Sequence, residues 1–88
     1  MSQPTHPSLH IADVRELARY LEVDALAECM DLALQNRDNP CYSKGESEQI
    51  MNVLAKAGFV KAQMAKGMTL VEAMRELAKR IRAFQIND

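Results

Sequence analysis

The chain has 88 residues, of which 48% are hydrophobic and 26% charged, and its formal net charge is −1. This composition is typical of one ordinary globular domain, and it excludes a large enzyme, a disordered chain and a strongly basic nucleic-acid-binding protein. The chain has four aromatic residues, no Trp, three Gly and three Pro, which predicts an aliphatic core and argues against an all-β fold with many tight turns.

The near-neutral total hides a difference between the two halves of the chain. Residues 1–44 contain four basic and seven acidic residues, whereas residues 45–88 contain seven basic and five acidic ones. The halves therefore carry −3 and +2. We expect this polarity to help one half dock on the other, or to help two copies pair head to tail.

The first half is predicted to form an arm and two helices. Residues 1–9 contain Pro4 and Pro7 among small polar residues, and we expect a flexible N-terminal arm before a single helical domain over 10–88. Helical spacing of apolar residues predicts helices over 10–22 and 24–36, with Asp24 as the N-cap of the second. No Gly or Pro separates them, so one long helix is the alternative.

The third helix is predicted over 44–66. Ser43 and Glu46 have the spacing of a capping box at its start, and Gly67 is placed to end it. Gly58 lies inside this helix, where it either splits the helix or permits a close crossing with another one. Met51 falls off the apolar stripes, as does Met68, and both are expected to be surface contacts.

The last helix, predicted over 69–86, has the clearest pattern. Thr69 and Glu72 have the spacing of a second capping box. Its apolar residues recur every three or four positions and form one seam, which consists of Leu70, Met74, Leu77, Ile81 and Phe84. The four elements predict an all-α fold, either a compact four-helix bundle or an orthogonal helical array.

The sequence offers little for metal binding or catalysis. His6 and His10 have a usable spacing, but Cys29 and Cys41 are twelve residues apart and form no short ligand pair. Cys41 has no base near it in the sequence that would activate it as a nucleophile. We therefore expect no metal, no cofactor, no catalytic residues and no enzymatic activity.

The cysteines and the N-terminus predict the compartment. Two cysteines make no disulfide framework, and we expect Cys29 and Cys41 to be reduced thiols. The first residues show no signal-peptide pattern, and no apolar run approaches the length of a membrane helix. The expectation is a cytoplasmic protein without membrane association.

Nucleic acid is an unfavoured partner on this sequence. Residues 13–30 have a partial helix-turn-helix pattern, but the helix that would enter the groove carries three acidic residues and no cation. The candidates for contact with an anionic partner are instead Arg75, Lys79 and Arg82, on one face of the last helix. Cations near a helix C-terminus also complement the helix dipole, which needs no partner.

These observations lead to two functional hypotheses. The first is a small non-enzymatic protein-interaction or regulatory module that self-associates as a homodimer, with the seam of the last helix as core or as contact surface. The alternative is a nucleic-acid-binding accessory protein that uses the basic C-terminal helix.

Overall fold

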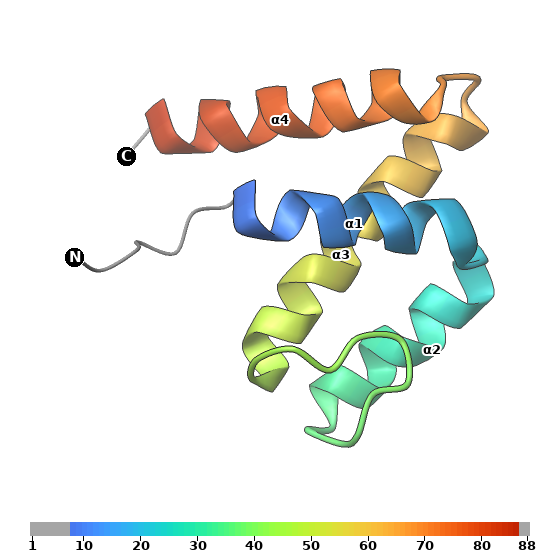
Figure 1. Cartoon of the computed structure of the whole chain (residues 1–88), viewed down its shortest axis with the longest axis vertical. Helices are drawn as coiled ribbons and strands as arrows, with labels where there is room; N and C mark the ends of the chain where they lie inside the picture. Colours follow the sequence, from blue (N-terminus) through green and yellow to red (C-terminus); the bar gives the residue numbers. More distant parts are fainter. Residues whose placement is uncertain (1–7, 87–88) are drawn as a thin grey trace.

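The computed structural model describes residues 8–86, and side chains from 11 to 83. It contains four helices, α1 Ser8–Tyr20, α2 Val23–Leu34, α3 Ser47–Ala65 and α4 Leu70–Ile86, and no strand in this part of the chain (Figure 1). The all-α prediction is confirmed. The predicted arm over 1–9 falls mostly outside the described residues, and α1 already begins at Ser8.

The helices pack around α3, which contacts each of the other three, and α1 also contacts α4. Figure 1 shows α1 and α4 running in nearly opposite directions, with α3 crossing both at a steep angle. The fold is therefore the orthogonal array of the two predicted architectures.

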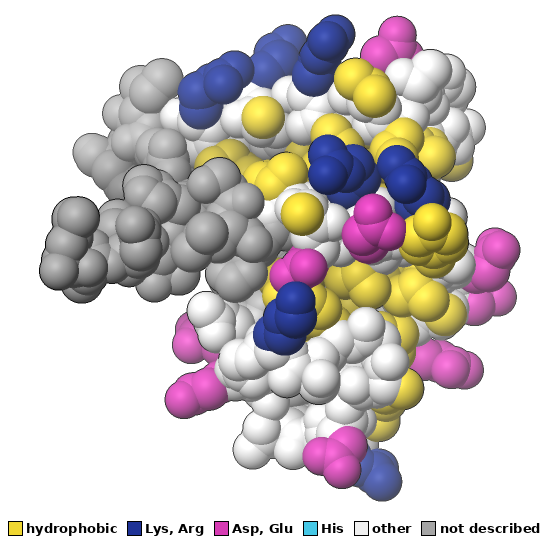
Figure 2. Space-filling model, viewed as in Figure 1, with side chains coloured by type: hydrophobic (Ala, Val, Ile, Leu, Met, Phe, Trp, Pro, Cys, Tyr) yellow, Lys and Arg dark blue, Asp and Glu magenta, His cyan; other side chains and the backbone are white. Residues whose placement is uncertain are grey.

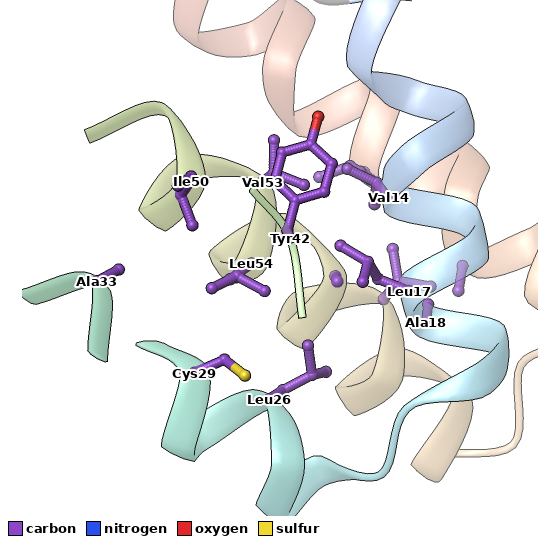
Figure 3. Close-up of a cluster of buried hydrophobic side chains, with 14 residues drawn as sticks. Val14, Leu17, Ala18, Leu26, Cys29, Ala33, Tyr42, Ile50, Val53 and Leu54 are labelled. Carbon is purple, nitrogen blue, oxygen red and sulfur yellow. The ribbon is translucent and has the colours of Figure 1, made fainter. Parts of the chain in front are cut away.

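The core is aliphatic, as the composition predicts, and α3 supplies its largest share. From α3 the buried apolar side chains are Ile50, Val53, Leu54, Ala57 and Val60. Figure 3 shows side chains from α1, α2 and the segment before α3 converging on them. Each fully buried Val or Leu contributes about 1.5–3 kcal/mol of transfer free energy, so this one side of α3 holds the other helices together.

The first two helices are separate, which decides the alternative that the sequence left open. Leu21 and Glu22 are not helical, and Glu22 occupies the N-cap position of α2 in an extended conformation without a side-chain cap bond. The predicted N-cap Asp24 is therefore wrong. Because α2 begins one residue earlier, Asp24 lies in its first turn, where its charge suits the helix dipole.

The capping box predicted from Ser43 and Glu46 is also wrong. The third helix begins at Ser47, with Glu46 at the N-cap and no side-chain cap bond. Gly45 has a φ of +91°, a left-handed conformation that turns the chain where the box would require helical residues. At Gly58, α3 continues unbroken, and a Cβ added there would meet nothing within 4 Å. Neither the split nor the close crossing expected at Gly58 occurs.

Two helices end in the same motif. Gly67, with φ at +110°, donates its amide to the carbonyl of Met64 (2.9 Å), and the next amide reaches Gln63 (3.3 Å). This pair of bonds is the Schellman motif, so the predicted role of Gly67 is confirmed. Asn36, with φ at 58°, ends α2 in the same way, and this reversal sends the following loop back along α2.

The capping box at α4 is confirmed, and it yields a direct prediction. The Glu72 amide donates to Thr69 Oγ1 (3.1 Å), and the Thr69 amide donates to Glu72 Oε1 (2.9 Å).

We expect Thr69→Ala to lower the free energy of unfolding by about 1 kcal/mol, measured by chemical denaturation. Ser43→Ala is the matched control and should change it little, because no cap forms there. Equal losses in the two variants would contradict this reading.

Candidate functional site

The segment between α2 and α3, which we call the 35–46 loop, is crosslinked to α2. Cys29 of α2 and Cys41 of the loop form a disulfide, with their Cα atoms 6.2 Å apart. The expectation of two reduced thiols is therefore wrong. A separation of twelve residues gave no sign of pairing, because the pairing depends on the reversal at Asn36. While the crosslink is intact, neither sulfur can act as a nucleophile or a thiolate ligand.

A buried amide side chain holds the same part of the loop. Asn39, which is 9% exposed, donates from Nδ2 to the carbonyl of Cys29 (2.7 Å) and accepts the amide of Cys41 at its Oδ1 (3.1 Å). One side chain thus bridges the backbones of the two disulfide-bonded residues. No sequence pattern predicts this role of Asn39, since a tertiary hydrogen bond leaves no local pattern.

Tyr42 fixes the far end of the loop to α1. Its ring lies in the core among side chains of α1 and α3 (Figure 3), and its hydroxyl donates to Oδ2 of Asp13 (2.6 Å). The other carboxylate oxygen of Asp13 lies 3.6 Å from Nζ of Lys44. Burial, the hydrogen bond to Asp13 and the charge of that carboxylate raise the pKa of Tyr42 to about 12.

These contacts show that the 35–46 loop holds α1 and α2 together, and they give it a structural role. Among the described residues, no group of three His, Cys, Asp or Glu side chains is placed to hold a metal ion. His6 and the side chain of His10 lie outside the described residues, so the expectation of no metal site stays a prediction.

The predicted seam of α4 only partly faces the core. Leu77 is buried, whereas Leu70, Met74 and Ile81 are half-buried, and the side chain of Phe84 lies outside the described residues. Ala73, which is not part of the predicted seam, is fully buried. The contact side of α4 is therefore centred between Ala73 and Leu77, which leaves one edge of the seam near the surface.

The predicted basic residues of α4 are exposed. Figure 2 shows Lys and Arg side chains along the upper edge of the molecule, over α4. Arg75, Lys79 and Arg82 are all at the surface, but Lys79 Nζ lies 3.9 Å from a carboxylate oxygen of Glu76. Glu76 also lies 3.9 Å from Arg80, so an acidic side chain reduces the positive charge along this helix.

The outward side of α3 carries two shallow hollows that the sequence did not predict. One lies between α3 and α4 and is lined mainly by apolar groups, including Phe59 and Ile81. The other lies between α2 and α3 and includes Leu34 and Met51. Asn52 and Ala55 line both hollows, so they form one continuous surface. We call this surface the α3 outer face.

The α3 outer face combines apolar side chains with a cation–π contact. Leu34 is 70% exposed at its α2 side, whereas Met51, which the sequence predicted as a surface contact, is half-buried and packs against the core. On the α4 side, the Arg80 guanidinium lies 5.3 Å from the centre of the Phe59 ring, a cation–π contact that keeps this ring in place. The sequence pattern missed the face because it combines residues from three helices.

Comparison of the chain with protein-family models, with curated proteins and with solved structures finds no match. In the part of the chain that the structure describes, no helix is both long and apolar enough to cross a membrane.

The disulfide should be a large share of the stability of this small fold. A crosslink between residues 29 and 41 closes a loop for which chain entropy gives about 3 kcal/mol. We expect a reducing agent to lower the free energy of unfolding by about this amount, measured by chemical denaturation. The double variant Cys29→Ala/Cys41→Ala is the control, and the reductant should not affect it. Two free thiols in the purified, unreduced protein would contradict the crosslink.

The raised pKa of Tyr42 should appear as a loss of stability at high pH. In the unfolded chain a Tyr titrates near pH 10, so the folded state, with its pKa at about 12, favours the protonated hydroxyl. This contribution is fully present below about pH 10 and is lost as the pH rises to about 12.

The test compares free energies of unfolding from pH 9 to pH 12. The stability advantage of the wild type over Tyr42→Phe should shrink across this range. Tyr20→Phe, at an exposed position, is the control. An advantage that stays constant with pH would show that Tyr42 is not held as described.

Proposed function

We propose that the protein is a small, non-enzymatic interaction module that self-associates. The α3 outer face carries this proposal, since it is a continuous, partly apolar surface across three helices that one copy leaves uncovered. Apolar surface of this kind, with polar groups at its edge, marks contact sites in globular proteins.

The chemistry of the described residues supports the non-enzymatic part of the proposal. Cys41 was the best candidate nucleophile in the sequence, and it is used in a crosslink. The most perturbed group, Tyr42, is held by Asp13 as part of the packing of the loop. Both of these groups therefore have a structural role.

The alternative, nucleic-acid binding through the basic side of α4, has weaker support. Binding to phosphates needs a cluster of cations that is not neutralised, whereas Lys79, one of the three candidate cations, lies near Glu76. If this alternative holds, a DNA or RNA oligomer binds with an affinity that falls steeply with salt and is lost on charge reversal of Arg75, Lys79 and Arg82.

A cytoplasmic location stays a prediction, and the disulfide weighs against it. Disulfides persist mainly in oxidising compartments and are rare in the cytosol. Trapping of free thiols in intact cells, followed by mass analysis of the peptides with Cys29 and Cys41, will show which state occurs in the cell.

The proposed function predicts a dimer in solution. Light scattering at tens of micromolar should give twice the mass of the 9.9 kDa chain, and Ile81→Asp should shift the protein to monomers while its helix content is kept. Val71→Asp is the matched control, because Val71 is an exposed apolar residue of the same helix outside both hollows. A monomeric wild type would contradict the proposal.

A further inference from the structure

The α3 outer face has opposite charges at its two ends. Glu48 lines the hollow next to α2, whereas Lys56 and Arg80 line the hollow next to α4. Neither Glu48 nor Lys56 makes an ion pair with another described residue. The face therefore has an acidic end and a basic end, each with an unpaired charge.

These charges are placed symmetrically about the middle of the face. Asn52, which lines both hollows, is four residues from Glu48 and four from Lys56. Four residues are about one helical turn, or about 6 Å along the axis. A two-fold axis near Asn52 would thus place the acidic end of one copy on the basic end of the other.

We propose that a second copy of this chain covers the α3 outer face about a two-fold axis near Asn52, with Glu48 of each copy against Lys56 of its partner. The same rotation places the hollow with Leu34 and Met51 over the partner's hollow with Phe59 and Ile81. This inference rests on the proposed self-association and assigns it to one surface.

The area needed for a stable dimer requires both hollows. A standard interface takes about 800 Å² from each partner, which is about an eighth of the 6203 Å² that this chain exposes. One shallow hollow between two helices is too small for this, so the contact has to extend across α3 from α2 to α4.

The two-fold arrangement also changes how the charge polarity of the sequence is understood. Head-to-tail pairing requires complementary charges on different faces and leads to rings or open chains. Here Glu48 and Lys56 lie at opposite ends of one face, which makes that face complementary to itself. The expected assembly is a closed dimer.

Charge reversal tests this arrangement by complementation. Glu48→Lys and Lys56→Glu each place like charges opposite one another in a homodimer, and each should weaken dimerisation at least tenfold in light-scattering titrations. An equimolar mixture, with one variant ¹⁵N-labelled, should recover a dissociation constant within about threefold of wild type. Native mass spectrometry should show mainly the mixed dimer. The double variant Glu48→Lys/Lys56→Glu should also dimerise.

Matched controls separate this effect from general changes in charge. Asp24→Lys and Lys66→Glu reverse exposed charges next to helix ends away from both hollows, and both should dimerise like wild type. Circular dichroism checks that each variant keeps its helix content. If Glu48→Lys loses helix content, Glu48→Gln replaces it. Glu48→Gln removes the charge without reversing it, so it should weaken dimerisation less than tenfold.

The outcomes distinguish the two proposals. A dimeric wild type whose single variants stay dimeric, or whose mixture does not recover, overturns the assignment to the α3 outer face and leaves self-association in place. A monomeric wild type overturns both. Weakening in the single variants together with recovery in the mixture supports both.

Discussion

The structure depends on the burial of one side of α3. This helix contacts all three others, and its side chains at positions such as Val53, Leu54 and Val60 are almost completely buried. A chain of 88 residues can build only a modest core, and here one central helix packs against the other three. As a consequence, the opposite side of α3 stays at the surface, between α2 and α4.

The 35–46 loop is the second element on which the fold depends. It contains no helix, yet it contributes Tyr42 to the core, and it is tied to α2 by Asn39 and the disulfide. Its ends also meet, because the Ser47 hydroxyl donates to the side chain of Asn36. By joining α1, α2 and the start of α3, this loop positions α2 beside the outward side of α3.

Local signals predicted most of the fold. Helical periodicity placed all four helices, and the Thr69–Glu72 capping box and the stop at Gly67 were confirmed because both depend on nearby residues. The Ser43–Glu46 box failed because Gly45 turns the chain out of the helical conformation. Spacing alone does not show whether the residues between two capping positions are helical.

Tertiary contacts explain what the sequence could not show. The disulfide, the Asn39 bridge and the Tyr42–Asp13 hydrogen bond join residues 10 to 29 positions apart. The α3 outer face likewise combines Leu34, Phe59 and Ile81 from three helices. The predicted seam on α4 includes Ile81, which lines part of this face. The buried side of α4 is instead centred between Ala73 and Leu77, to one side of the predicted seam.

Self-association through the α3 outer face is the central claim, and crosslinking at Asn52 tests it most directly. Asn52 is exposed in the single chain, and a two-fold axis near it brings the two copies of this residue together. Asn52→Cys should therefore form a covalent dimer under mild oxidation, seen on a non-reducing gel. Ala12→Cys, exposed on α1, should not. Equal crosslinking of both variants, or none at Asn52→Cys, would contradict the account.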